Sequence, residues 1–120
     1  MDKRCYEFGS YEDNIQAAKS LNGLEYLQAM MNGSIAPAPA VTTNGIDAVA
    51  CAFGYAEFSI TPQDFHFNAV GTVHGGVITT ILDTAMGCTL MTTLTKEKTF
   101  TTLELKVNFF FFIESPISVV

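Results

Sequence analysis

A chain of 120 residues can bury one hydrophobic core, which suits a single domain and leaves little surplus for a second core. Apolar residues make up 48% of the chain and charged residues 15%, which indicates a globular, well-buried protein. The formal net charge of −6 argues against binding to nucleic acid or to an anionic membrane surface.

Residues Asn14–Met31 carry apolar side chains at helical spacing, with a break expected at Asn22–Gly23 that divides them into two short helices. Asn32–Gly33 predicts the end of the second helix, as a C-cap glycine does. The alternating alanines and prolines of Ala36–Ala40 predict an extended linker, because proline and the residue before it both avoid the helical region.

Two strands are predicted next, Ile46–Phe53 and Tyr55–Ile60, separated by a tight bend at Gly54. The second strand alternates polar and apolar residues, which is the period of a half-buried strand. A loop is expected from Thr61 to Val73.

The segment Gly75–Met91 predicts a helix that is apolar nearly all round, so we expect it to be buried. Small residues such as Gly87 lie on one face of this helix, where they allow a sheet to pack closely against it. After the charged turn at Lys96–Lys98, residues Thr99–Phe112 predict a long strand. This order indicates an α+β protein, with one central helix against an antiparallel sheet.

The start of this central helix carries a pattern suited to chemistry on a carbonyl group. His74, Gly75 and Gly76 stand directly before or at the helix N-terminus, where free N–H groups and a partial positive charge are available. The Gly75 amide is a candidate donor to the oxyanion of a thioester carbonyl. Asp83, a carboxylate in an apolar helix, is a candidate general base for water or a nucleophile.

The spacing of these groups predicts an oligomer. Nine residues at a rise of 1.5 Å place Asp83 roughly 13 Å along the helix from His74, whereas catalytic groups act within ~3 Å of the reacting atoms. Two antiparallel copies of the helix could each pair Gly75 with the other copy's Asp83. The sequence therefore predicts a homodimer with shared sites.

Two segments closely resemble the PaaI-type branch of the hotdog-fold acyl-CoA thioesterases. The first runs from His74-Gly75-Gly76-Val77 to Leu82-Asp83-Thr84-Ala85-Met86-Gly87, and the second is Thr101–Phe109. The resemblance covers roughly residues 20–109. It implies a hotdog fold, in which an antiparallel sheet wraps around one long central helix, and hydrolysis of an acyl- or aryl-CoA to the acid and CoA. No cofactor and no metal are expected.

The resemblance also implies residue roles. Asp83 would be the acidic catalytic residue, Gly75 would supply the oxyanion N–H, and Asn68 would orient water or thioester. His74 would shape the site through hydrogen bonds, and Thr102 would help to position water. The residues expected to contact the substrate, including the CoA phosphates, are Val73, Gly76, Lys96 and Lys98.

One departure from the family concerns the C-terminal tail. Family members continue into further strands after the Val107-Asn108-Phe109 motif, whereas residues 110–120 diverge after four consecutive phenylalanines. We therefore expect a truncated or frame-shifted hotdog domain, with residues 1–43 as a helical lead-in and linker. An alternative function follows, namely an acyl-CoA-binding remnant with weak or no catalysis. An unpaired apolar strand would also favour aggregation.

Each candidate residue also has a structural interpretation. Asp83 could be exposed or capped, Asn68 a turn residue, Thr102 an ordinary strand residue, His74 structural, and both glycines loop residues. A hotdog dehydratase is disfavoured, because it would need an Asp and a His close together. Five residues after Asp64 the chain has Ala69, and five residues after Asp83 it has Cys88. The methionines are interpreted as core filler, namely Met30, Met31, Met86 and Met91.

The three cysteines, Cys5, Cys51 and Cys88, are an odd number without close spacing, which argues against a disulfide framework or zinc site. We expect reduced thiols in a cytoplasmic protein, with Cys51 and Cys88 buried. The spacing of His66, His74, Asp83 and Cys88 fits no metal-ligand pattern. No secretory signal and no membrane span are predicted.

Overall fold

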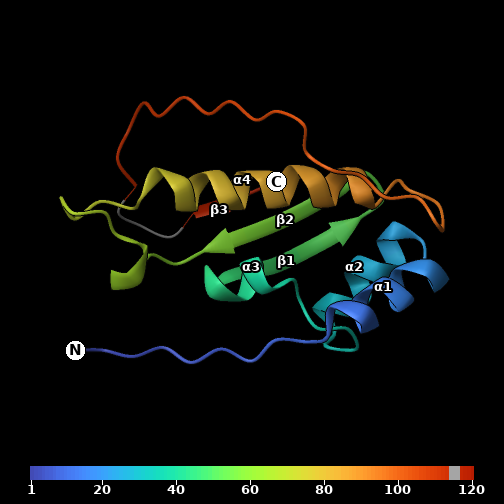
Figure 1. Ribbon diagram of the computed structural model, residues 1–120. Coiled ribbons are helices and arrows are strands. Elements are labelled where there is room, and N and C mark those ends of the chain that lie inside the picture. The colour runs from blue at the N-terminus through green and yellow to red at the C-terminus, as the bar shows by residue number, and fades with distance from the viewer. Residues whose placement is uncertain (114–116) are drawn as a thin grey trace.

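The computed structural model describes residues 1–113 and 117–120, and a long helix packed against a small antiparallel sheet forms its centre (Figure 1). The helix is α4 (Gly75–Met91), with the bounds predicted from sequence. The sheet begins with the hairpin of β1 (Ile46–Ala52) and β2 (Tyr55–Ile60). The hairpin turns at Gly54, whose φ of +71° a glycine adopts without strain.

The core lies between β2 and α4. The alternate residues Ala56, Phe58 and Ile60 of β2 are buried, and they meet Ile81 and Ala85 of α4 in one apolar cluster. The apolar face of β2, with its period of two residues, therefore packs against an apolar face of α4, as predicted. This contact fixes α4 across the sheet.

The expectation that α4 would be buried nearly all round is wrong. Only Ile78, Ile81 and Ala85 are buried, whereas Met86 and Leu90 are about half exposed, at 52% and 49%. A small sheet covers one side of a helix, so the apolar residues on the other side of α4 remain accessible.

The helical lead-in divides where predicted, into α1 (Tyr11–Ser20) and α2 (Gly23–Met31). The Asn22 side chain accepts from the Glu25 N–H, and the Glu25 carboxylate accepts from the Asn22 N–H, each at 2.9 Å. This capping box starts a new helix and explains the break. Helix α2 ends at Met31 and is capped by Asn32, directly before Gly33 at φ +82°, as expected for a helix C-terminus.

The linker prediction for Ala36–Ala40 is wrong in its second half, where a short helix α3 (Pro39–Thr43) begins. Pro39 is in the first turn of α3, where the missing N–H costs no hydrogen bond and the fixed φ suits a helix. Proline therefore started a helix here rather than preventing one.

The predicted strand Thr99–Phe112 is also not observed: within the described residues 99–113 there is no strand. This segment runs in an extended path over α4, on the side away from β1 and β2 (Figure 1). Strand β2 pairs with β1 on one side and, through Phe58–Ile60, with β3 (Ile117–Val119) on the other. A strand forms only beside a partner strand, and this segment lies over α4 instead of beside the sheet (Figure 1).

Strand β3 was not predicted from sequence. It pairs with Phe58–Ile60 of β2 and gives the sheet the order β1-β2-β3. The preceding part of the divergent tail, residues 114–116, lies outside the described residues. Among the described helices, none combines the length and apolar character required to cross a bilayer.

Candidate active site

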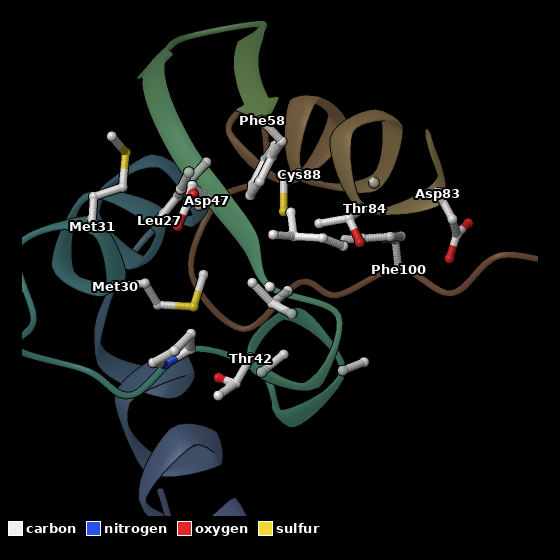
Figure 2. Close-up of a pocket in the computed structure, with 18 residues that line it drawn as sticks. Leu27, Met30, Met31, Thr42, Asp47, Phe58, Asp83, Thr84, Cys88 and Phe100 are labelled. Carbon is white, nitrogen blue, oxygen red and sulfur yellow. The ribbon is translucent and has the colours of Figure 1, made fainter. Parts of the chain in front are cut away.

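Asp83 lies on α4 beside a cavity of about 580 Å³ (Figure 2). Its Oδ1 atom accepts a hydrogen bond of 2.7 Å from the Thr102 hydroxyl. This bond joins the helix to the extended segment that follows it, and it fixes one oxygen of the carboxylate. The second oxygen, Oδ2, has no hydrogen bond within the described part of the chain, so it is available to a water or a substrate.

The N-terminus of α4 is capped by His74. Its Nδ1 atom accepts from the Gly76 N–H at 2.9 Å, so the neutral ring carries its proton on Nε2. The N–H groups of Val77 and Ile78 donate to the His74 carbonyl. Among residues 1–113 and 117–120, the Gly75 N–H has no acceptor, which makes it the free donor at this helix end.

The role of Gly76 follows from the same cap. Since its N–H is bonded to His74, Gly76 cannot offer that donor to a ligand unless His74 moves. Gly75 is partly covered by the Phe109 ring, which would be 3.3 Å from a Cβ atom at that position. A residue with a side chain at position 75 would therefore require Phe109 to shift.

Asn68 organises the loop before the helix. Its Oδ1 accepts from the N–H groups of Val70 and Thr72, at 3.0 and 3.2 Å, and its Nδ2 donates to the Thr72 hydroxyl at 2.9 Å. The side chain thus holds its own loop in the way expected of a turn asparagine. Val73 next to the helix is 5% exposed, so its side chain belongs to the interior.

The structure thus brings Asp83 and Thr102 together but leaves the other candidates apart. Asp83 lies eight positions after Gly75 on α4, or about 12 Å along the helix axis. Neither Asn68 nor any of residues 73–76 lines the cavity beside Asp83. Lys96 and Lys98 are exposed in the turn after α4, at the end opposite Gly75. Within one chain these groups do not converge.

Cys88, one and a half turns after Asp83, also lines the cavity. Burial raises the pKa of its thiol to about 11, with a smaller contribution from the neighbouring Cys51. A thiol with this pKa is protonated at neutral pH, so Cys88 is a poor nucleophile. The prediction that Cys51 and Cys88 are buried is only partly right, since both are of intermediate exposure.

His66 is a structural histidine. It is 1% exposed, its Nδ1 accepts from the Gln63 N–H at 2.9 Å, and its Nε2 donates to the Asn44 carbonyl at 2.6 Å. Both ring nitrogens are therefore occupied. In the described residues, no three His, Cys, Asp or Glu side chains gather as they would around a metal ion.

Comparison with known proteins bears on this geometry. The family model described as "Thioesterase superfamily" matches residues 70–110. A crystal structure of a phenylacetic acid degradation-related protein from Ralstonia eutropha JMP134, itself named a candidate thioesterase, is similar with a TM-score of 0.67 and 29% identity. The similarity covers 78% of this chain and 73% of that one. A comparison with curated proteins gave no match.

The chain is similar to the thioesterase superfamily over residues 70–110 and shares the fold of that crystal structure. This confirms the resemblance stated from the sequence, including the PaaI-type branch, and the α+β hotdog architecture. The matched residues 70–110 of this hotdog protein include Gly75, Asp83 and Thr102. Similarity to this superfamily supports thioester hydrolysis as the general reaction.

Sequence reasoning missed the residues of this hotdog domain that form the far wall of the cavity. Met30 and Met31 of α2 were interpreted as core filler, but both line the cavity together with residues of α3. Phe100 also lines it, packed against Gly87, where a Cβ atom would be 2.7 Å from the ring. The small residue at position 87 was noted, but nothing in the sequence indicated which ring would fill that space.

Proposed function

We propose that this hotdog protein hydrolyses an acyl- or aryl-CoA thioester to the free carboxylic acid and CoA. The observation that carries the proposal is Asp83, a carboxylate with one oxygen held by Thr102 and the other free, at the edge of a mostly apolar cavity. A carboxylate fixed in this way can remove a proton from water or attack the thioester carbon itself.

In the general-base form of the mechanism, a water molecule attacks the thioester carbon while its proton passes to Asp83. The carbonyl oxygen becomes an oxyanion, which a free backbone N–H such as that of Gly75 stabilises. The intermediate then expels the CoA thiolate by breaking the C–S bond, and the proton held by Asp83 passes to the sulfur. In the nucleophilic form, Asp83 attacks the thioester carbon, the C–S bond breaks, and CoA leaves as the thiolate. Water then hydrolyses the resulting anhydride to the free acid and the Asp83 carboxylate, and the proton released passes to the thiolate.

Each site is proposed to draw its two groups from different copies of the chain, in a homodimer or a tetramer of such dimers. The separation of about 12 Å between Gly75 and Asp83 on one helix exceeds what one thioester carbon can bridge. With α4 helices antiparallel, Gly75 of one copy would approach Asp83 of the other. Asn68, His74 and Gly76 would support the oxyanion end of the site. Lys96 and Lys98 are proposed to contact the CoA phosphates. Val73 is proposed to support the site from the interior.

The first test is Asp83→Asn, assayed on a panel of acyl- and aryl-CoAs with a thiol reagent that detects free CoA. We expect kcat to fall by about 10²- to 10⁴-fold, the usual contribution of a general base. Asp47→Asn is the matched control, since Asp47 also lines the cavity but is exposed on β1. Wild-type turnover by Asp83→Asn would overturn the proposal.

The second test uses mixed oligomers. Gly75→Pro removes the N–H while keeping the first helical position, which accepts proline, and the extended His74 (φ −61°, ψ 132°) suits the residue before a proline. Each of Gly75→Pro and Asp83→Asn alone should be inactive. Mixed by unfolding and refolding, they should recover roughly one quarter of wild-type activity, because half of the dimers then contain one intact site. No recovery would refute shared sites.

A second candidate function is an acyl-CoA-binding protein with little or no catalysis. The observation that favours it is the Phe109 ring packed beside Gly75, at the helix end proposed to hold the oxyanion. Binding of acyl-CoA without release of CoA would support this function.

The expected truncation of the C-terminal tail and the cytoplasmic location stay predictions. Sequencing of independent copies of the coding region tests the truncation, and fractionation of cells tests the location.

A further inference from the structure

The cavity beside Asp83 extends away from the helix into the helical lead-in. One wall is α4, the floor is β1 and β2, and the opposite wall is formed by α2 and α3. Figure 2 shows Asp83 at one end, with Met30 and Met31 at the other and Phe58 and Cys88 between them. A ligand that reacts at Asp83 would therefore direct its remaining bulk towards α2.

The chemistry of the cavity restricts what this bulk can be. Its volume of about 580 Å³ lies within the range of small-molecule sites, about 300–1,000 Å³. Most of the described lining residues are apolar, none is basic, and the two charged ones are the carboxylates Asp47 and Asp83. The phosphates of CoA would be repelled there, so the uncharged end of a thioester fits and the nucleotide end does not.

Met30 is the residue best placed to limit the size of that end. It is half-buried, it packs against the core cluster, and it is part of the wall opposite Asp83. An unbranched thioether side chain adapts to irregular space, but it still occupies volume that a ligand would need. A larger residue at position 30 would shorten the cavity from the end away from the chemistry.

We propose that this cavity holds the apolar acyl group of the thioester and that Met30, in the helical lead-in, sets the largest acyl group that fits. The inference rests on the proposed function for the identity of the ligand. Its test therefore measures binding rather than turnover, so that a protein without hydrolase activity can still support or refute it.

The probes are S-alkyl-CoA thioethers of increasing chain length, which cannot be hydrolysed, titrated calorimetrically into the full chain. Each methylene that enters an apolar site should raise the affinity about fourfold, until the cavity is full and the affinity levels off. Met30→Trp should level off at a chain several carbons shorter than the wild type, and Met30→Ala at a longer one. Gln28→Trp, on an exposed position of the same helix, should match the wild type.

The position of the plateau does not depend on the fraction of folded protein, so partial misfolding of one variant does not mimic the expected result. Equal plateaus for Met30→Trp, Met30→Ala and the wild type would overturn the inference. So would an affinity independent of chain length, which is the result expected if a second copy of the chain fills the cavity. Shifted plateaus without any hydrolysis would uphold the inference while refuting the enzymatic proposal.

Discussion

The Thr102 hydroxyl donates a 2.7 Å hydrogen bond to Asp83, although the two residues are 19 positions apart in the sequence. Asp83 lies in the middle of α4, and Thr102 lies in the extended segment that runs over this helix. The bond therefore places a donor from an irregular segment on the carboxylate proposed to do the chemistry. A hydroxyl so placed orients the carboxylate rather than reacting itself.

Thr102→Val should lower kcat about tenfold and leave the free energy of unfolding nearly unchanged. Valine keeps the shape but cannot donate to Asp83, so the carboxylate loses its fixed orientation. Thr102 is exposed, so water replaces the lost bond and little stability depends on it. Steady-state hydrolysis and thermal unfolding check the two parts. Thr101→Val is the control, and an equal loss of kcat in both variants would contradict the orienting role.

Gly23→Ala should destabilise the fold by about 1 to 3 kcal/mol, or lower Tm by about 5 to 10 °C. A Cβ atom at Gly23 would lie 1.7 Å from the Met91 carbonyl oxygen, so the start of α2 would be forced away from the end of α4. This contact also includes a hydrogen bond of 3.0 Å from the Gly23 N–H to the Leu94 carbonyl. The gain from replacing a helical glycine, up to ~1 kcal/mol, is smaller than this clash.

Differential scanning calorimetry measures the effect of Gly23→Ala. Gln28→Ala in the same helix is the control, because an exposed substitution of this kind stays within about 0.5 kcal/mol. A Tm for Gly23→Ala equal to that of the wild type would contradict the close contact between α2 and α4.

The stability of the protein should fall between about pH 9 and pH 11 through the Cys88 thiol. Burial raises its pKa from 9.0 to about 11, so the unfolded chain releases this proton first as the pH rises. Above pH 9 the folded state binds more protons than the unfolded state, and the free energy of unfolding therefore decreases with pH. The decrease should be on the order of 2 kcal/mol and complete near pH 11.

Urea unfolding at pH 8, 9, 10 and 11 measures this dependence. Other groups titrate in the same range, so the informative quantity is the difference between the wild type and Cys88→Ala. Cys5→Ser, at an exposed position, should retain the wild-type pH dependence. An identical slope in the wild type and Cys88→Ala would refute the assignment.

Phe111→Lys should reduce aggregation of the purified protein. Phe110, Phe111 and Phe112 are 82%, 89% and 80% exposed, which makes a contiguous apolar surface on an extended segment. Such surfaces promote association, and a charge within them opposes it. Light scattering during concentration gives the measurement. Phe53→Lys is the control: Phe53 is 74% exposed but lies in the turn between β1 and β2, outside the run of phenylalanines, so its replacement should have little effect. Equal effects would contradict a role for the cluster.

The sequence by itself determined the elements whose cause is local. The bounds of α4, the break at Asn22–Gly23 and the hairpin at Gly54 all follow from caps, glycine conformations and apolar periods acting over a few residues. It also indicated Asp83 and Gly75 as candidate chemical residues, from their pattern around a helix N-terminus, and that role stays a prediction. These features need no knowledge of distant partners.

Tertiary structure alone decided the features that depend on which partner is available. Thr99–Phe112 has the alternation of a strand, but a strand forms only beside a partner strand, and this segment lies over α4, away from the hairpin of β1 and β2. The hydrogen bond between Thr102 and Asp83 and the cavity wall at Met30 likewise join residues far apart in the chain. A local pattern states what a segment can do, whereas the packing of the whole chain determines which of those options is realised.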